Sequence, residues 1–360
     1  PDNWLDAFLM LEMLLESKNT SEKQVVFLDE LPWMDTHKSG FITAFEGFWN
    51  TWGCHRKNLM VIVCGSATSW ITDNLINNHG GLYNRLTYEM KLSPFSLGEC
   101  EQYFAESGIK MSRYDIVQAY MITGGIPYYL SYFKKGKSLS QNVDELFFAK
   151  TAKLKNEFER LFLSIFNRPE LMMVIVKCLS TRNAGYTRSE IASKIGCSTG
   201  GTFSQALNAL IESDFIVKYV PFGYSKRKEH YKLVDPFCMF FIKFVENKTK
   251  LNGVFWQQNQ VSQSVVSWRG FAFEGVCFNH INQIKSALGI SGVSATYSAW
   301  SKREDDEDGT QVDLIIERKD NVVNMCEIKF YGNDFSVNKD YHKILINRQE
   351  LLSKELSPKM

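Results

Sequence analysis

The stretch EKQVVFLDELPW, residues 22–33, decides how the first part of the chain folds. Its apolar run, Val25 to Leu28, ends in two acids, Asp29 and Glu30. An unbroken apolar run of this length is typical of a strand that lies buried in a parallel sheet. Ligands of open parallel sheets bind beyond the carboxyl ends of the strands, so the two acids stand where a site is expected.

The residues around this strand predict further elements of the same sheet. Helical spacing of apolar residues predicts a helix over 3–16, and another is expected over 39–52. The segment LMVIVCGSA (59–67) predicts a second buried strand, and YEMKLSPFS (88–96) predicts a third. Strands that alternate with helices favour a parallel α/β sheet.

Four polar side chains near the ends of these strands form a candidate nucleotide site. In nucleotide hydrolysis one carboxylate supports Mg²⁺ and a second polarises the attacking water, roles that suit Asp29 and Glu30. Ser66 ends the second strand, where a polar group can sense a phosphate. Arg85 precedes the third strand, from which it can reach a phosphate in its own subunit or across a homo-oligomer. Acids that only solvate a strand end, and a surface ion pair for Arg85, are the simpler alternatives.

Four motifs in this part of the chain resemble those of the archaeal-type ATPases of the AAA+/STAND group. They agree with that group in order and spacing and are VVFLDELPW (25–33), VIVCGSATSWI (61–71), LYNRLTYEMKLSPFSLGE (82–99) and ITGGIPYYL (122–130). The resemblance implies that Asp29 and Glu30 are the Walker B pair of an ATP- and Mg²⁺-binding site. It also implies Ser66 as the phosphate sensor and Arg85 as a finger-like arginine. Gly124, Gly125 and Pro127 match the motif of a helical lid.

The chain departs from this group in one large respect, because no phosphate loop of the form GxxxxGK[ST] precedes the strand. The segment Gly136-Lys137-Ser138 has Ser131 where the leading glycine belongs, and it falls after the Walker B strand. We therefore expect that the phosphate-loop region is missing from the start of the chain. These residues alone are expected to lack ATPase activity.

A change of pattern near residue 155 predicts a winged helix. Helical patterns over 171–180, 187–196 and 198–216 are followed by a hairpin over 217–236 with a basic tip, SKRK. Lys226, Arg227 and Lys228 at this tip are candidate contacts to DNA phosphates. Domain packing or dimerisation is an equally good use for such a domain.

A second carboxylate site is predicted in GTQVDLIIERKDNVVNMCEIKFY (309–331). If this hairpin turns about Asp320, Asp313 and Glu327 lie opposite each other, with Cβ atoms roughly 4.5–5.5 Å apart. Two carboxylates that close repel unless one is protonated or a cation lies between them, and Mg²⁺ is a natural occupant. Lys329 shares the face of Glu327 and can orient or deprotonate a water. A charged, solvated strand face is the alternative.

The D-x(13)-E-x-K spacing resembles the PD-(D/E)XK nuclease superfamily, of the restriction-endonuclease type. The resemblance implies Asp313, Glu327 and Lys329 as the catalytic set, and Glu274 in the helix before the hairpin as an additional acid. A helix glutamate that is merely solvated is the alternative for Glu274. The acidic stretch 303–309 is expected to be a solvated loop.

Composition limits the classes of protein that the chain can belong to. The formal net charge of +1 does not indicate nucleic-acid binding by the whole chain. The eight cysteines lack the spacing of a zinc site and fit reduced thiols of a cytoplasmic protein. No apolar run is long enough to cross a membrane.

Together these patterns predict a multidomain α/β protein. The expected domains are a partial P-loop-type ATPase core (1–96), a helical lid (97–154), a winged helix (155–250) and a restriction-endonuclease-like α/β domain (251–360). The corresponding function is an ATPase coupled to a nuclease-like domain that acts on DNA. Two alternatives stay open: a non-catalytic regulator associated with DNA, and an ATP switch whose last domain binds protein.

Overall fold

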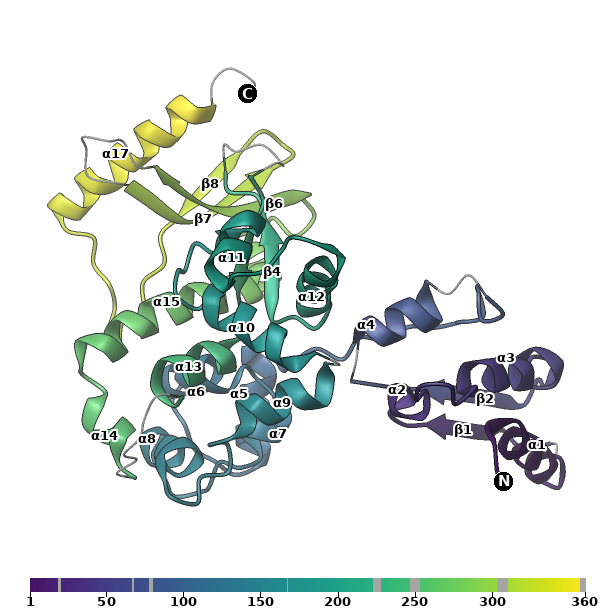
Figure 1. Cartoon of the computed structure of the whole chain (residues 1–360). Coiled ribbons are helices and arrows are strands. Elements are labelled where there is room, and N and C mark those ends of the chain that lie inside the picture. Colours follow the sequence, from purple (N-terminus) through teal and green to yellow (C-terminus); the bar gives the residue numbers. More distant parts are fainter. Residues whose placement is uncertain are drawn as a thin grey trace. The chain divides into compact units, whose positions relative to one another are not determined.

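The computed structural model describes residues 1–18, 21–66, 68–77, 80–166, 168–222, 228–246, 253–302 and 310–356, and it is a mixed α/β protein (Figure 1). The chain divides into two compact units. The first is Pro1–Leu92 with Ile165–Asn167, and the second is Ser93–Ser164 with Arg168–Met360. Among the described residues, no helix combines the length and the apolar character that crossing a bilayer would need.

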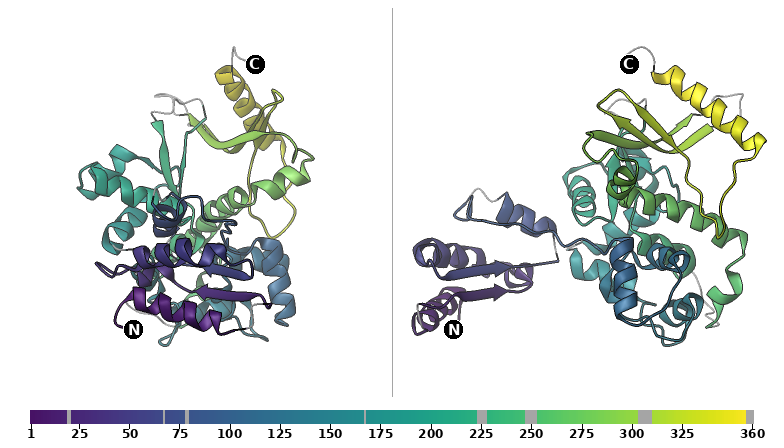
Figure 2. Two further views of the ribbon diagram at one scale, coloured as in Figure 1. Left: turned by 90° about the vertical axis from the view of Figure 1, so that its right-hand side faces the viewer. Right: turned by 180° about the vertical axis from the view of Figure 1, so that it is seen from behind.

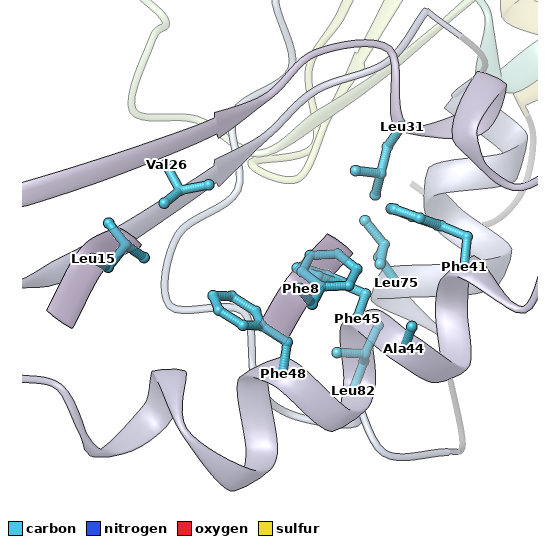
Figure 3. Packing of buried hydrophobic residues seen from close by; sticks show 10 residues of the cluster. All are labelled: Phe8, Leu15, Val26, Leu31, Phe41, Ala44, Phe45, Phe48, Leu75 and Leu82. Atoms are coloured by element: carbon cyan, nitrogen blue, oxygen red, sulfur yellow. The ribbon is translucent and has the colours of Figure 1, made fainter. Parts of the chain in front are cut away.

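The first unit is built on two parallel strands, β1 (Gln24–Leu28) and β2 (Leu59–Val63), with Val26 paired to Val61. Its helical segments are α1 (Trp4–Glu16), α2 (Leu31–Met34), α3 (Phe41–Thr51), η1 (Gly53–His55), α4 (Thr68–Ile71) and η2 (Thr72–Ile76). Aromatic rings from α1 and α3 fill the core, and Phe8 stacks on Phe48 with centroids 5.1 Å apart (Figure 3). This core covers one face of the two strands.

The other face of the two strands is apolar and exposed. Val25 and Phe27 of β1 lie beside Met60 and Ile62 of β2, because parallel register partners point to the same side. The strands predicted over 25–30 and 59–67 are thus confirmed as β1 and β2.

The third strand predicted over 88–96 is wrong, since these residues adopt neither strand nor helix up to Ser96. The side chains that would have lined it, Tyr88, Met90 and Leu92, are 76%, 65% and 86% exposed. Alternating apolar residues make a strand only where a neighbouring strand accepts their backbone hydrogen bonds. Among the described residues, neither β1 nor β2 pairs with this segment.

The second unit begins with short helices at the positions expected for a lid. These are α5 (Leu97–Glu106), α6 (Arg113–Thr123), α7 (Pro127–Leu130), α8 (Leu139–Val143), η3 (Asp144–Phe148) and α9 (Glu157–Ile165). The sequence TGGIP separates α6 from α7. Gly124 ends α6 with φ +68°, and Gly125 follows with φ +72°, so that the amide of Phe95 donates to the Gly125 carbonyl at 2.9 Å.

The next part of the chain combines helices with an antiparallel sheet of strand order β3-β5-β4. Its elements are α10 (Pro169–Leu179), β3 (Tyr186–Thr187), α11 (Arg188–Ile195), α12 (Gly201–Glu212), β4 (Ile216–Tyr219), β5 (His230–Leu233) and α13 (Pro236–Phe244). The expected helices and hairpin arms are present. The assignment to the winged-helix class remains a prediction.

The C-terminal part holds an antiparallel sheet of order β6-β7-β8, and α17 packs along β7 (Figure 2). Its elements are α14 (Phe255–Asn259), α15 (Gln263–Asn279), α16 (Ile281–Ala287), β6 (Ala295–Lys302), β7 (Thr310–Arg318), β8 (Val323–Cys326) and α17 (Lys339–Leu356). Leu314 and Ile316 of β7 face one core with α16, while Ile315 faces a second core with Leu352 of α17. The acidic stretch 303–309 lies outside the described residues.

Gly125 of the TGGIP turn should tolerate an added methyl group less well than Gly136, which has a similar backbone conformation. A Cβ atom there would lie 2.3 Å from the Phe95 carbonyl oxygen, whereas a Cβ at Gly136, with φ +75°, would meet nothing within 4 Å. We expect Gly125→Ala to lower the free energy of unfolding by about 3 kcal/mol or more, because backbone must move. Gly136→Ala, which meets only the left-handed backbone strain, should cost about 1–2 kcal/mol. Equal losses for the two variants in urea titrations would contradict this assignment.

Candidate functional site

The first candidate site lies where β1 and β2 end at the same edge of their sheet. Pairing continues beyond both strands, since the Cys64 amide donates to the Leu28 carbonyl at 3.1 Å and the Leu31 amide donates to the Cys64 carbonyl at 2.8 Å. Between these bonds Glu30 adopts a left-handed conformation, φ +50°, and precedes α2. This turn brings the acids of β1 next to the residues that follow β2.

Ser66 and Glu30 are in direct contact. The Ser66 hydroxyl donates to Glu30 Oε2 at 3.0 Å, and the Ser66 amide donates to the same oxygen at 3.3 Å. Sequence analysis predicted both residues for one site, and the structure brings them together. The bond links the turn that follows β1 to the segment that follows β2.

Cys64 is a neighbour of this site that sequence analysis missed. Its thiol donates to Asp29 Oδ1 at 2.7 Å, and this hydrogen bond, together with burial, raises the pKa of the thiol. The signal was available, because Cys64 is the first residue after β2, as Asp29 is the first after β1. In the described part of the chain, the second carboxylate oxygen of Asp29 accepts no hydrogen bond.

Asp29 fits the role of a magnesium ligand. Its carboxylate is exposed, and Mg²⁺ in nucleotide sites is commonly held by one or two carboxylates together with phosphates and waters. Arg85 is not brought to these acids: it is exposed, and its side chain makes no hydrogen bond or ion pair within the described residues. Its predicted role remains a prediction.

The second candidate site lies at the open end of the β7–β8 hairpin. The ladder pairs Leu314 with Cys326, so that Asp313 and Glu327 are the next two opposite positions, as predicted. The ammonium of Lys329 lies 2.5 Å from Glu327 Oε1 and 3.9 Å from Asp313 Oδ2. Asp313 Oδ2 also accepts from the Ile328 amide at 2.9 Å.

Two side chains of α17 complete the surroundings of Glu327. Tyr341 donates its hydroxyl to Oε1, and Arg348 donates from Nη1 to Oε2 at 2.5 Å. Neither residue was predicted from the sequence. Their spacing of seven, which places them on one face of a helix, is a signal that could have found them once the hairpin was suspected as a site.

Burial and neighbouring groups shift the pKa values of Asp313, Glu327 and Lys329. Burial raises the pKa of Asp313, and the nearby charge of Glu327 adds to the effect. Burial would also raise the pKa of Glu327, but the hydrogen bonds from Lys329 and Tyr341 and the charge of Arg348 lower it overall. Burial alone would lower the pKa of Lys329, but its hydrogen bonds with Glu327 and Tyr341 raise it overall.

Glu274 of α15 approaches the cluster from a different element. Its Oε2 accepts a hydrogen bond from the Asn183 amide group at 2.7 Å, and burial raises its pKa. Lys232 of β5 acts electrostatically on both Glu274 and Asp313, and its ammonium lies 5.3 Å from the ring centroid of Phe278, one turn along α15. Sequence analysis missed Asn183 and Lys232, because nothing in the chain order shows that the β3-β5-β4 part packs against α15.

The acids of the hairpin do not fit a divalent cation as they stand. Both oxygens of Glu327 and one oxygen of Asp313 are already hydrogen-bonded. Among the described residues, no three His, Cys, Asp or Glu side chains gather closely enough to hold a metal ion. Mg²⁺ between Asp313 and Glu327 therefore stays a prediction, and it would have to displace the ammonium of Lys329, which lies between the two acids.

The described residues include only part of the basic tip of the predicted wing. Lys226 and Arg227 lie outside the described residues, and Lys228 is exposed. Nearby, Lys218 is paired with Glu229 at 3.4 Å. On α12, Ser204 accepts from Arg188 at 2.6 Å, so this hydroxyl is engaged within the protein.

Comparisons with known proteins give one structural similarity. No protein-family model and no curated protein matches the chain. The Walker-type ATPase PABY2304 of Pyrococcus abyssi superposes with a TM-score of 0.41 and 19% sequence identity. The match covers 61% of this chain and spans 63% of the length of that one. It does not establish the activity of this chain.

Glu274 and Glu327 should respond in opposite directions to replacement by glutamine. The pKa of Glu274 is raised in the folded protein, so its ionised form destabilises the fold above that pKa. We expect Glu274→Gln to raise the melting temperature at pH 8, with the gain vanishing below about pH 4, where glutamate is protonated in the unfolded chain.

The pKa of Glu327 is lowered, so its ionised form stabilises the fold at neutral pH, and this contribution is lost as the pH falls through the folded pKa. Glu327→Gln should lower the free energy of unfolding at pH 8 by about 3 kcal/mol, the scale for breaking a buried ion pair. Thermal melts of both variants between pH 4 and pH 8 check the signs. A loss of stability in Glu274→Gln at pH 8 would contradict the first expectation.

Proposed function

We propose that the first unit carries the magnesium- and water-positioning half of a nucleotide-hydrolysis site of ATPase type. The observation that carries this proposal is the contact of Ser66 with Glu30 across the ends of two adjacent parallel strands. A surface pair of acids would need no such partner. Ligands of parallel sheets bind at this edge, which supports the same use.

The residues of this site divide the chemistry between them. Asp29, whose second oxygen accepts no hydrogen bond in the described part of the chain, would hold Mg²⁺, which supplies positive charge to phosphate oxygens. Glu30 would take a proton from the attacking water, held in place by its left-handed backbone and by Ser66. The Ser66 hydroxyl, which now donates to Glu30, can instead donate to a terminal phosphate. Arg85 is the proposed further phosphate contact, within one subunit or between subunits of a homo-oligomer.

Affinity for nucleotide should be low in these 360 residues. The residues before β1 hold no glycine-rich loop, and backbone amides of such a loop supply many of the phosphate contacts. Isothermal titration with Mg-ATP should show no micromolar binding. A micromolar dissociation constant would show that another part of the chain binds the phosphates.

Glu30→Gln tests the catalytic assignment in a protein in which a phosphate loop precedes β1. We expect ATP turnover to fall by about 10² or more while Mg-ATP binding persists, because glutamine cannot accept the proton. Ser66→Ala should reduce turnover less, since the carboxylate remains. Unchanged turnover in Glu30→Gln would remove Glu30 from the mechanism.

As a second function we propose that the hairpin site acts on DNA in the manner of a nuclease. The favouring observation is that Lys329 bridges Asp313 and Glu327, with Glu274 held nearby by Asn183. Lys329, whose pKa is raised by its hydrogen bonds, can orient a water beside a phosphodiester as a cation, and Lys226, Arg227 and Lys228 would contact the DNA backbone. A DNA-associated regulator without catalysis, and a protein-binding end domain, are the competing uses.

A plasmid-nicking assay separates these uses. Nicking by the wild type should be lost in Asp313→Asn and in Lys329→Ala, whereas Lys343→Ala, an exposed lysine paired with Asp340, should leave it unchanged. DNA that is retained but uncut would favour the regulator. Neither retention nor cleavage would favour a protein ligand.

A further inference from the structure

The hairpin site is closed by one face of α17. Tyr341, Leu345, Arg348 and Leu352 recur at helical spacing and are the less exposed side chains along this face. Leu352 is buried in the core with Trp300 and Ile315. Two of the other three side chains, Tyr341 and Arg348, donate hydrogen bonds to Glu327.

The pair of Arg348 with Glu327 is largely shielded from water, with side chains 16% and 15% exposed. Asp313, Glu327, Lys329 and Arg348 carry two negative and two positive charges, so the cluster is neutral without any bound ion. A divalent cation would have to compete with Arg348 for Glu327 Oε2 and with Lys329 and Tyr341 for Oε1.

Arg348 is not fully satisfied in this position. Its Nε–H is buried and has no hydrogen-bond acceptor within the described residues. A buried donor without a partner is a cost to the closed arrangement, and release of the side chain to water would recover it. Nη1 of Arg348 therefore binds Glu327, while the Nε–H would gain a hydrogen bond from water if the side chain moved into solvent.

We propose that Arg348 is a latch that occupies the cation position of the hairpin site and must leave Glu327 before a divalent cation can bind. This control of cation binding does not depend on nuclease activity. Only the use of the bound cation rests on the proposed nuclease function. The helix stays attached through Leu352 when the latch opens, because that contact is apolar and independent of Glu327.

Replacing Arg348 by methionine tests the latch, since methionine keeps an unbranched apolar side chain but removes the donor to Glu327 Oε2. Binding of Mn²⁺ is measured by electron paramagnetic resonance on the full chain, with Asp29→Asn in every variant so that the first site does not contribute. We expect Arg348→Met to bind Mn²⁺ at least about tenfold more tightly than the parent, the scale on which one neighbouring charge alters a carboxylate equilibrium. Adding Asp313→Asn should abolish the gain.

Lys343→Met is the matched control, because it removes a positive charge from the exposed side of the same helix. It should leave Mn²⁺ affinity unchanged. If Arg348→Met does not fold, Tyr341→Phe removes one of the two donors to Glu327 Oε1 with its ring retained, and it should give a smaller gain. Equal Mn²⁺ affinity in the parent and in these variants, or a gain that persists with Asp313→Asn, would overturn the proposal. A gain in Mn²⁺ affinity without plasmid nicking would uphold the latch and reject the nuclease function.

Discussion

The register between β7 and β8 is the constraint on which the second unit's site depends. Leu314 lies opposite Cys326, and the same register puts Asp313 opposite Glu327. Because successive side chains point to opposite faces, a slip by one residue would carry Glu327 into the core that holds Cys326 and Ile328. The apolar residues on both faces of β7 thus fix where the charges go. The acids need no bond between themselves to be held opposite each other.

The two candidate sites differ in how the negative charge of their acids is balanced. At the ends of β1 and β2, Asp29 is exposed and Glu30 is bound by neutral donors from Ser66, so net negative charge is left facing solvent. At the hairpin, Lys329 and Arg348 balance the two acids within the protein. The acids after β1 can accept a cation without losing a positive partner. At the hairpin, a cation would have to displace the positive groups of Lys329 and Arg348. Similar carboxylate pairs in sequence therefore have different electrostatic states.

Features that depend on neighbours in sequence could be predicted from the chain alone. The opposition of Asp313 and Glu327 follows from where the hairpin turns, and the meeting of Glu30 and Ser66 follows from two parallel strands that end together. The segment 88–96 was predicted wrongly, since its alternation shows that it suits a sheet but not that a strand lies beside it. Asn183 and Lys232 could not be predicted, because their proximity to Glu274 arises from the packing of elements that are far apart in the chain.

The aromatic contact beside Lys329 has a mechanical consequence. Phe330 stacks on Tyr114 of α6 with centroids 4.7 Å apart and an angle of 7°, and it also lies 5.1 Å from Phe273 of α15. Phe330 follows Lys329 directly in the chain, so its ring connects α6 to the end of the hairpin that carries Lys329. Any reorientation of α6 has to either break this stack or pull on the backbone of Lys329. A displacement of α6 would therefore reach the backbone of Lys329 through this stack, without passing through the core of the sheet.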